Sequence, residues 1–226
     1  MDNKRCNRMI GWLKAGFYLP GIASLMMFSP LNAESELTDE DYWAPVQQPV
    51  VHPVWIQDRH TGESVLTYVE EPDYSLWNRQ RITDYEEAMQ VDASPALGVL
   101  TIEKLNINVP IYNGTDDFNL DRGAGRIKGM AKMDEAGNLG ISGHRDGFFR
   151  SFKDIEVGDD IEIQTPRGVE TYAVSSINII PKEDTSPLAP SDKKMLTLIT
   201  CYPFYYVGHA PKRMIVKAFP KQSSVE

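Results

Sequence analysis

The feature that most constrains this chain is a series of short extended segments that begins at Leu97 and runs almost to the last residue. The segments are rich in Val, Ile, Thr and Tyr, and Gly, Pro, Asp or Asn falls between them. They read LGVLTIEKL, INVPIY, GNLGISGH, DDIEIQT, VETYAVSSINII, KMLTLIT and PKRMIVKAF. No amphipathic helix of ten or more residues separates them, which argues against a parallel sheet of βαβ units. The pattern predicts a mainly β domain, either a β-barrel or a β-sandwich.

Two further patterns precede this domain. The stretch VVHPVWIQDRHTGESVLTYVE predicts a β-hairpin that turns at Thr61 and Gly62. Residues 75–90 predict a helix that begins at Ser75 as its N-cap. Its expected apolar face consists of Leu76, Ile82, Tyr85 and Met89.

The N-terminus reads as a targeting element. Arg5 and Arg8 precede an apolar stretch from Met9 to Phe28 that only Lys14 interrupts. This pattern predicts export, either behind an uncleaved membrane anchor, which we favour, or behind a signal peptide cleaved near Ala33. We therefore divide the chain into a signal or anchor (1–33), an acidic extension with the helix (34–92), a β-domain (93–220) and a tail (221–226).

The charge balance excludes one class of partner. The 226 residues carry a net charge of −9, and residues 1–33 hold four of the 23 basic but only one of the 32 acidic side chains. The remainder therefore has a net charge of −12. Because binding to phosphates needs clustered Lys and Arg, we expect no nucleic-acid partner.

The cysteine count becomes informative once export is expected. The chain has two cysteines, and Cys6 lies before the apolar segment. Cys201 then has no disulfide partner outside the cytoplasm and no second thiolate for a metal site. It either fills the core as a small apolar residue or acts as a nucleophile.

A nucleophilic thiol needs a proton acceptor or a positive neighbour. His144 ends the predicted strand GNLGISGH beside a loop, where a barrel presents groups to a cleft. Arg213 lies 12 residues after Cys201, and pairing of their two strands brings them side by side. Its guanidinium keeps its proton and stabilises either a thiolate or an oxyanion. We predict that Cys201, His144 and Arg213 are the catalytic residues.

Together these motifs resemble those of the sortases, cysteine transpeptidases of bacterial surfaces. The resemblance rests on TLITC (197–201), a GH dipeptide that ends 57 residues earlier, and the later arginine, and it covers roughly 97–219. GHRDGFFRSF, TCYPFYYVGHAPKR and the helix SLWNRQRITDYEEAM look most like class D, with the Gram-negative or marine sortases second.

The resemblance implies a closed eight-stranded sortase-type β-barrel with short helices, here with an N-terminal helical extension. It implies that Cys201 attacks an LPxTG-like C-terminal sorting signal after its threonine and forms a thioester. His144 then protonates the leaving amine and later takes the proton of the incoming amine, and Arg213 holds the substrate and the oxyanion. We expect Thr200, Tyr202 and His209 to contact substrate, and we expect no cofactor and no metal.

The implied partners are surface proteins that bear a sorting signal, an amine acceptor such as a cell-wall peptide or a pilin lysine, and the membrane. The implied location is the cell membrane, with the catalytic domain on the extracytoplasmic side.

Two alternatives stay open at this point. One is an exported β-barrel binding module with Cys201 in its core. The other is an unrelated cysteine peptidase or transpeptidase. Papain-like enzymes place the cysteine early on a helix, whereas Cys201 comes late and ends a predicted strand. Transpeptidases with a Ser-His-Gly-Cys element hold the two residues only a few positions apart.

Overall fold

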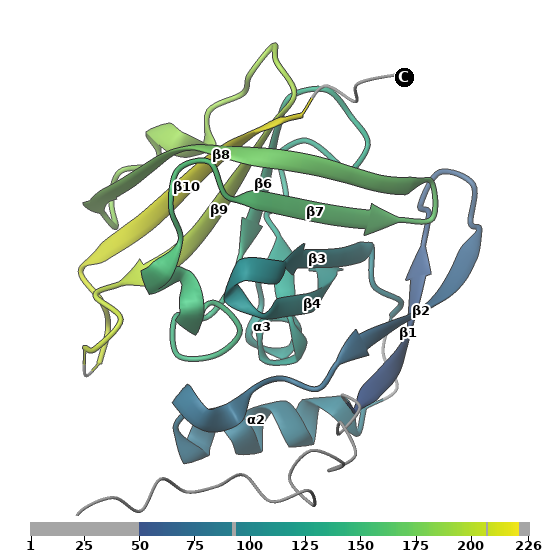
Figure 1. Cartoon of the computed structure of the whole chain (residues 1–226), viewed down its shortest axis with the longest axis horizontal. Coiled ribbons are helices and arrows are strands. Elements are labelled where there is room, and N and C mark those ends of the chain that lie inside the picture. The colour runs from purple at the N-terminus through teal and green to yellow at the C-terminus, as the bar shows by residue number, and fades with distance from the viewer. Residues whose placement is uncertain (1–49, 92–93, 207, 222–226) are drawn as a thin grey trace, which may run out of the picture. The chain divides into compact units, whose positions relative to one another are not determined.

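The computed structural model describes residues 50–91, 94–206 and 208–221, which all belong to one compact unit spanning 47–226. A closed barrel of eight strands forms most of it, and a two-stranded hairpin packs beside the barrel (Figure 1). The hairpin consists of β1 (Val51–Gln57) and β2 (Ser64–Glu70). The barrel strands are β3 (Gly98–Ile102), β4 (Ile107–Asn113), β5 (Ala124–Arg126), β6 (Asn138–Ser142), β7 (Asp160–Thr165), β8 (Gly168–Pro181), β9 (Met195–Tyr202) and β10 (Lys212–Pro220). The expected closed eight-stranded barrel is confirmed.

The strands follow the order β10-β8-β7-β3-β4-β5-β6-β9 around the barrel, and β9 closes it against β10. Two neighbouring pairs, β4 with β5 and β6 with β9, are parallel. The remaining pairs are antiparallel. Because β6 and β9 run in the same direction, their carboxyl ends lie at the same end of the barrel.

Side-chain alternation along the strands builds the core. In β9, Leu196 and Leu198 join the core cluster, and in β10 Met214 and Val216 do so. Ile102, Ile161 and other branched side chains contribute from the remaining strands. Successive side chains on a strand point to opposite faces, so the intervening residues of β9 and β10 face outward.

The helices within the described residues are few and short. The α-helices are α2 (Arg79–Met89) and α3 (Asp117–Arg122), and the 3₁₀ turns are η1 (Tyr74–Leu76), η2 (Glu103–Leu105), η3 (Arg150–Asp154) and η4 (Ser186–Leu188). In Figure 1, α2 lies beneath the barrel on the side of α3.

The predicted helix over 75–90 is partly wrong. Ser75 does not cap it; instead the Asn78 side chain accepts a hydrogen bond from the Arg81 amide and starts α2. Residues 74–76 form the separate turn η1, which Asp73 caps through the Ser75 amide. Of the expected apolar face only Tyr85 is buried, whereas Leu76 and Met89 are exposed.

The predicted hairpin is confirmed, and its turn has a clear physical cause. The Asp58 carboxylate accepts hydrogen bonds from the His60 and Thr61 amides, and Gly62 takes the positive φ of +75° that the turn requires. Val54, Ile56 and Val69 pack against the barrel through the buried side chains of Ala96, Val99 and Tyr112.

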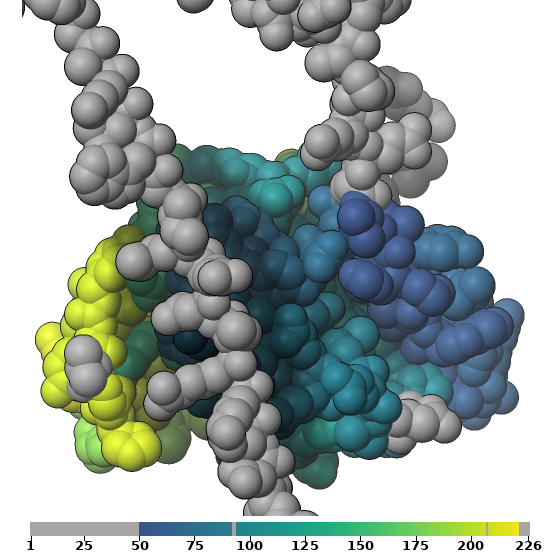
Figure 2. Space-filling view, turned by 90° about the horizontal axis from the view of Figure 1, so that it is seen from below, coloured from purple at the N-terminus to yellow at the C-terminus, as the bar shows by residue number. Residues whose placement is uncertain are grey.

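An ion pair adds to this packing. Arg167, in the β7–β8 turn, binds both Asp58 of the hairpin and Asp134 of the barrel. In Figure 2 the hairpin and the yellow β10 lie on opposite sides of the face shown.

The N-terminal targeting prediction concerns residues outside the described part of the chain. Within that part, none of the helices combines the length and the apolar character needed to cross a bilayer. The proposed boundary near residue 92 stays a prediction, although the segments on its two sides are in contact through the hairpin's packing on β3 and β4.

Replacing Asp58 with Asn tests the ion pair. The hydrogen bond from Arg167 lowers the pKa of Asp58 from 3.8 to about 2. A carboxyl group whose pKa is lower in the folded than in the unfolded protein stabilises the fold at every pH above the unfolded pKa. This stabilisation is lost as the pH falls through the folded pKa. We expect Asp58→Asn to reduce hydrogen-exchange protection of β1 and β2 at pH 7, and we expect this difference from wild type to shrink between about pH 4 and about pH 2.

Glu63→Gln is the matched control, because it removes an exposed carboxylate from the same turn. A difference between wild type and Asp58→Asn that persists undiminished at the acid end would contradict the assigned role of the Asp58 charge.

Candidate active site

The pairing of β9 with β10 sets the position of the single described cysteine. Cys201 lies directly opposite Arg213 in this antiparallel ladder. Directly opposed residues point to the same face of a sheet, with Cβ atoms about 4.5–5.5 Å apart. The expectation that strand pairing brings Cys201 and Arg213 side by side is confirmed.

The same ladder shows on which face the pair lies. Thr200 pairs with Met214, which belongs to the core cluster, so these two side chains face inward. Cys201 and Arg213 therefore face outward, and both are half-buried. A thiol on the outer face is open to a ligand in a way that a core residue is not. This position argues against the binding-module alternative, in which Cys201 fills the core.

The Arg213 guanidinium is held by backbone oxygen atoms. Its Nη1 donates to the carbonyls of Ala210 at 3.1 Å and Lys212 at 2.9 Å. Among the ion pairs of the described residues, none involves Arg213. The guanidinium of the residue opposite Cys201 is thus held by carbonyl oxygens and has no carboxylate partner among the described residues.

The parallel pairing of β6 with β9 brings His144 to the same end of the barrel. Ser142 pairs with Ile199, so His144 and Cys201 each follow this pair by two residues. Past the last pair, the Gly143 amide donates to the Ile199 carbonyl, and the Thr200 hydroxyl donates to the Gly143 carbonyl at 2.8 Å. These two bonds extend the contact between the strands to the residues that flank Cys201 and His144.

The glycine before His144 is required by packing. A Cβ atom at Gly143 would lie 2.7 Å from the ring of Phe149, which is fully buried. Only a residue without a side chain lets the backbone approach this ring so closely. This packing fixes the position of the backbone just before His144.

His144 is mostly buried and is surrounded by charge. Its side chain is 23% exposed, and its Nε2 lies 3.6 Å from Oδ1 of Asp121 in α3. Burial lowers the pKa of His144 below its usual 6.5, and the nearby Arg81 lowers the pKa further. Asp146, Asp117 and Asp84 act in the opposite direction. The neutral imidazole is therefore favoured at neutral pH.

Two arginines from the loop after His144 hold the loop between β9 and β10. Arg145 donates to the carbonyls of Tyr206 and Gly208, at 2.8 and 3.0 Å. Arg150 donates to the Phe204 carbonyl at 2.5 Å, and its guanidinium lies 4.2 Å from the centre of the Tyr205 ring. The loops that follow the histidine and the cysteine are thus tied together.

The three expected substrate contacts lie in different surroundings. Thr200 is 1% exposed and its hydroxyl is engaged by Gly143. Tyr202 is half-buried beside Phe204, and His209 is exposed in the β9–β10 loop. Their contact with substrate stays a prediction.

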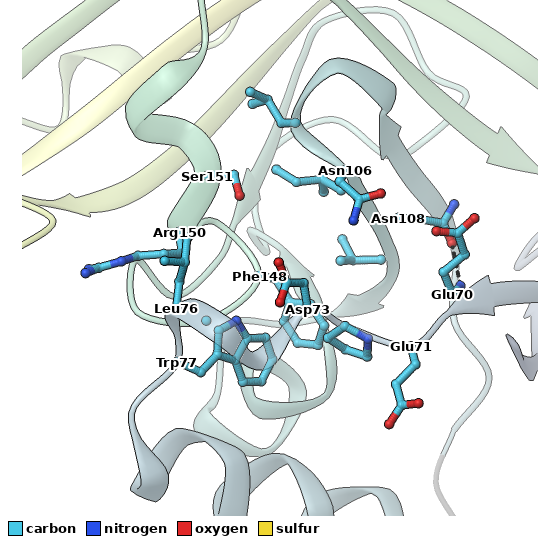
Figure 3. A pocket seen from close by; sticks show the side chains of 15 residues that line it. Glu70, Glu71, Asp73, Leu76, Trp77, Asn106, Asn108, Phe148, Arg150 and Ser151 are labelled. Carbon is cyan, nitrogen blue, oxygen red and sulfur yellow. Dashed lines mark hydrogen bonds between the residues drawn. The ribbon is translucent and has the colours of Figure 1, made fainter. Parts of the chain in front are cut away.

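A small pocket lies on the other side of the loop after His144. Figure 3 shows Trp77 and Phe148 in it, with Asp73 near them and Arg150 directed away. The Trp77 ring meets that of Phe148 edge to face, 4.9 Å between centres. Cys201, His144 and Arg213 do not line this pocket. Its walls instead join the segment before α2 to the His144 loop.

The sequence did not reveal the neighbours of His144. Asp121 lies in a six-residue helix that was not predicted, and Arg81 lies on a helix that was predicted but not placed. The Asp116 N-cap, whose side chain accepts from the Asn119 amide, was an available signal for α3. In 50–91, 94–206 and 208–221, no group of three His, Cys, Asp or Glu side chains is arranged to hold a metal ion.

Comparison with known proteins agrees with this arrangement. Residues 100–221 match the model of the Sortase domain. Sortase D of Bacillus subtilis (strain 168) is 41% identical over 126 residues, which cover 55% of this chain and 64% of that protein. Sortase A of Streptococcus agalactiae is 26% identical over 133 residues, covering 55% of this chain and 52% of that protein.

A solved structure of a Clostridium perfringens Sortase D5 transpeptidase superimposes with a TM-score of 0.52 and 26% identity. The superposition covers 62% of this chain and 88% of that one. The chain spans about half to two thirds of the length of the curated relatives that it matches. Because the family model matches more than half of the 226 residues and the barrel has the expected closure, the chain belongs to the sortase family and is similar to its class D members.

Proposed function

We propose that this protein is a cysteine transpeptidase that cleaves a C-terminal sorting signal resembling LPxTG after its threonine and transfers the new acyl group to an amine. The observation that carries the proposal is the position of Arg213 directly opposite Cys201 on the outer face of the barrel. Family membership and the position of His144 at the end of the neighbouring strand support it.

The first half-reaction forms a thioester. The Cys201 thiolate attacks the threonine carbonyl carbon, and the Arg213 guanidinium binds the oxyanion that results. A fixed positive charge in a half-buried site stabilises this oxyanion more than water does. The C–N bond then breaks, and the leaving amine takes a proton from the His144 imidazolium.

The second half-reaction reverses these roles. An incoming amine attacks the thioester carbonyl, and neutral His144 accepts its proton. The S–C bond breaks, and Cys201 leaves as a thiolate beside Arg213. Because the pKa of His144 is lowered, the imidazolium is a minor form at neutral pH, and only the fraction of molecules that holds both thiolate and imidazolium begins the reaction.

We assign the cellular setting from the sequence. Residues 1–33 serve as the anchor or signal, and residues 93–220 form the catalytic domain on the extracytoplasmic side. Surface proteins with a sorting signal supply the acyl group, and a cell-wall peptide or a pilin lysine supplies the amine.

The test is an acyl-transfer assay on the full-length protein with LPxTG and LPxTA peptides and a small amine, followed by mass spectrometry. We expect a thioester adduct on Cys201 that the amine resolves, and no adduct with Cys201→Ala. We expect Arg213→Met to lower kcat by roughly 10²–10³-fold, the usual loss when an oxyanion donor is removed.

Lys212→Met is the matched control for Arg213→Met. It removes the same charge from the adjacent, exposed position, which points to the opposite face, so its rate should stay within about two-fold of wild type. Absence of any adduct, together with a thiol that alkylating reagents do not modify, would instead support a binding module.

A second test compares the roles of the two threonines of TLITC in stability and in transfer. Both hydroxyls are buried: Thr200 donates to the Gly143 carbonyl, and Thr197 donates to Asn138 Oδ1 at 2.7 Å. Either Thr→Val variant should lower the free energy of unfolding by about 1–2 kcal/mol, since each leaves a buried acceptor unpaired. Only Thr200→Val should lower the transfer rate strongly, by about ten-fold or more, because its bond aligns His144 with Cys201. Equal rates for the two variants would refute this role.

A further inference from the structure

An element outside the matched family domain reaches the proposed general acid. Arg81 lies on α2, and the Sortase match begins only at residue 100. Its Nη1 binds Asp121 Oδ1, the same oxygen that faces Nε2 of His144. Its Nη2 lies 3.6 Å from Asp146 Oδ1, two residues after His144. One guanidinium therefore joins three elements around the imidazole.

Packing fixes α2 in this place. A Cβ atom at Gly147 would lie 3.3 Å from Arg81 Cδ and 3.6 Å from His144 Cβ, so Arg81 contacts the His144 loop closely. The rings of Trp77 and Tyr85 both meet Phe148 edge to face, at 4.9 and 5.8 Å between centres. Helix α2 also packs on α3, which carries Asp121. Arg81 and Asp121 are only 15% and 18% exposed, so water screens their pair weakly.

We propose that Asp121 is a positioning residue for His144, that Arg81 holds it in place, and that the proton transferred in the reaction is carried by Nδ1 of the imidazole. This inference rests on the proposed transpeptidase function. A carboxylate that faces Nε2 favours the neutral tautomer with its proton on Nε2 and leaves Nδ1 free for the substrate. Asp121 also stabilises the imidazolium, as an orienting carboxylate does in other nucleophile–histidine systems.

The proton balance follows directly. During thioester formation the S–C bond forms, the C–N bond breaks, and Nδ1–H of the imidazolium protonates the leaving amine. The remaining proton stays on Nε2, directed at Asp121. During transfer the new N–C bond forms and the S–C bond breaks, and Nδ1 takes the proton of the incoming amine. Burial raises the pKa of Asp121, and the Arg81 guanidinium opposes this by lowering it, so Arg81 favours the ionised carboxylate. In this scheme Asp121 exchanges no proton, and neither residue touches substrate.

The titratable and charged groups around His144 together determine how its protonation depends on pH. They are Arg81 and Asp84 of α2, Asp117 and Asp121 of α3, Asp146 of the His144 loop, Cys201 of β9 and Arg213 of β10. Removing a negative neighbour destabilises the imidazolium, and removing a positive neighbour stabilises it. Asp121→Asn should therefore lower the pKa of His144, and Arg81→Met should raise it.

The experiment is an NMR titration of the full-length protein labelled with ¹⁵N and ¹³C histidine, in which His144→Gln assigns the His144 signals. We expect wild type to hold the neutral tautomer protonated on Nε2, and Asp121→Asn to lose that preference with the lowered pKa. Asp121→Glu retains the charge and should restore the preference. Glu87→Gln removes an exposed carboxylate from α2, the helix that carries Arg81, and should leave the tautomer and pKa of His144 unchanged.

The kinetic readout is the division of the effect between kcat and KM. Asp121→Asn should lower kcat by about ten-fold to a hundred-fold, which is at or below the lower end of the 10²–10⁴ that a general acid contributes, because the imidazole itself remains. It should change KM less than about two-fold. Wild-type values of tautomer, pKa and kcat in Asp121→Asn would overturn the proposal. Because the titration needs no substrate, an inactive wild-type protein would refute the proposed function while the titration still decides the positioning role.

Discussion

The candidate site depends on the parallel pairing of β6 with β9. These strands are separated by more than 50 residues, so His144 and Cys201 are far apart in the sequence and only the pairing brings them to the same end of the barrel. Two buried threonine hydroxyls fasten the pairing at its two ends, Thr197 to Asn138 and Thr200 to Gly143. A buried hydroxyl without a partner is costly, so these bonds favour the register in which both are made over one shifted by a residue. The alignment of the two strand ends follows from that register.

Residues on the two faces of the barrel wall have different roles. Inward side chains such as Leu198 and Met214 supply apolar burial, while outward neighbours, Cys201 and Arg213, are free to differ chemically. Closure removes the sheet edges, so β10 at Arg213 pairs on both sides, with β8 and with β9, while the ladder of β9 with β6 ends at Ile199, two residues before Cys201. An arginine and the proposed nucleophile are thus held on the barrel wall without placing a charge in the core. Of the three proposed catalytic residues, the one that is mostly buried is instead His144, and its burial lowers its pKa.

Local patterns predicted the strands, because period-two alternation and turn residues are properties of neighbouring positions. The pairing of Cys201 with Arg213 was also predictable, since a short loop joins their strands. The short β5, with its sequence Ala-Gly-Arg, carries no strand signal, and only pairing with β4 and β6 makes it one. The Arg81–Asp121 pair joins residues 40 positions apart on two helices, and no periodicity marks such a contact. Ser75 failed as a cap because Asn78 offered its side chain to the first turn of α2.

The surroundings of His144 place part of the proposed chemistry outside the residues that the family model matches. The match to the Sortase domain covers His144, Cys201 and Arg213, but it excludes Trp77, Tyr85 and Arg81. Aromatic packing holds Trp77 and Tyr85 against Phe148, four positions after the histidine. Any change in how α2 packs therefore alters the charge and the solvent exposure of the imidazole while the three residues of the barrel stay the same. An extension of this kind adjusts the protonation of a shared site from outside it, because burial and a neighbouring guanidinium, rather than the identity of the histidine, set its pKa.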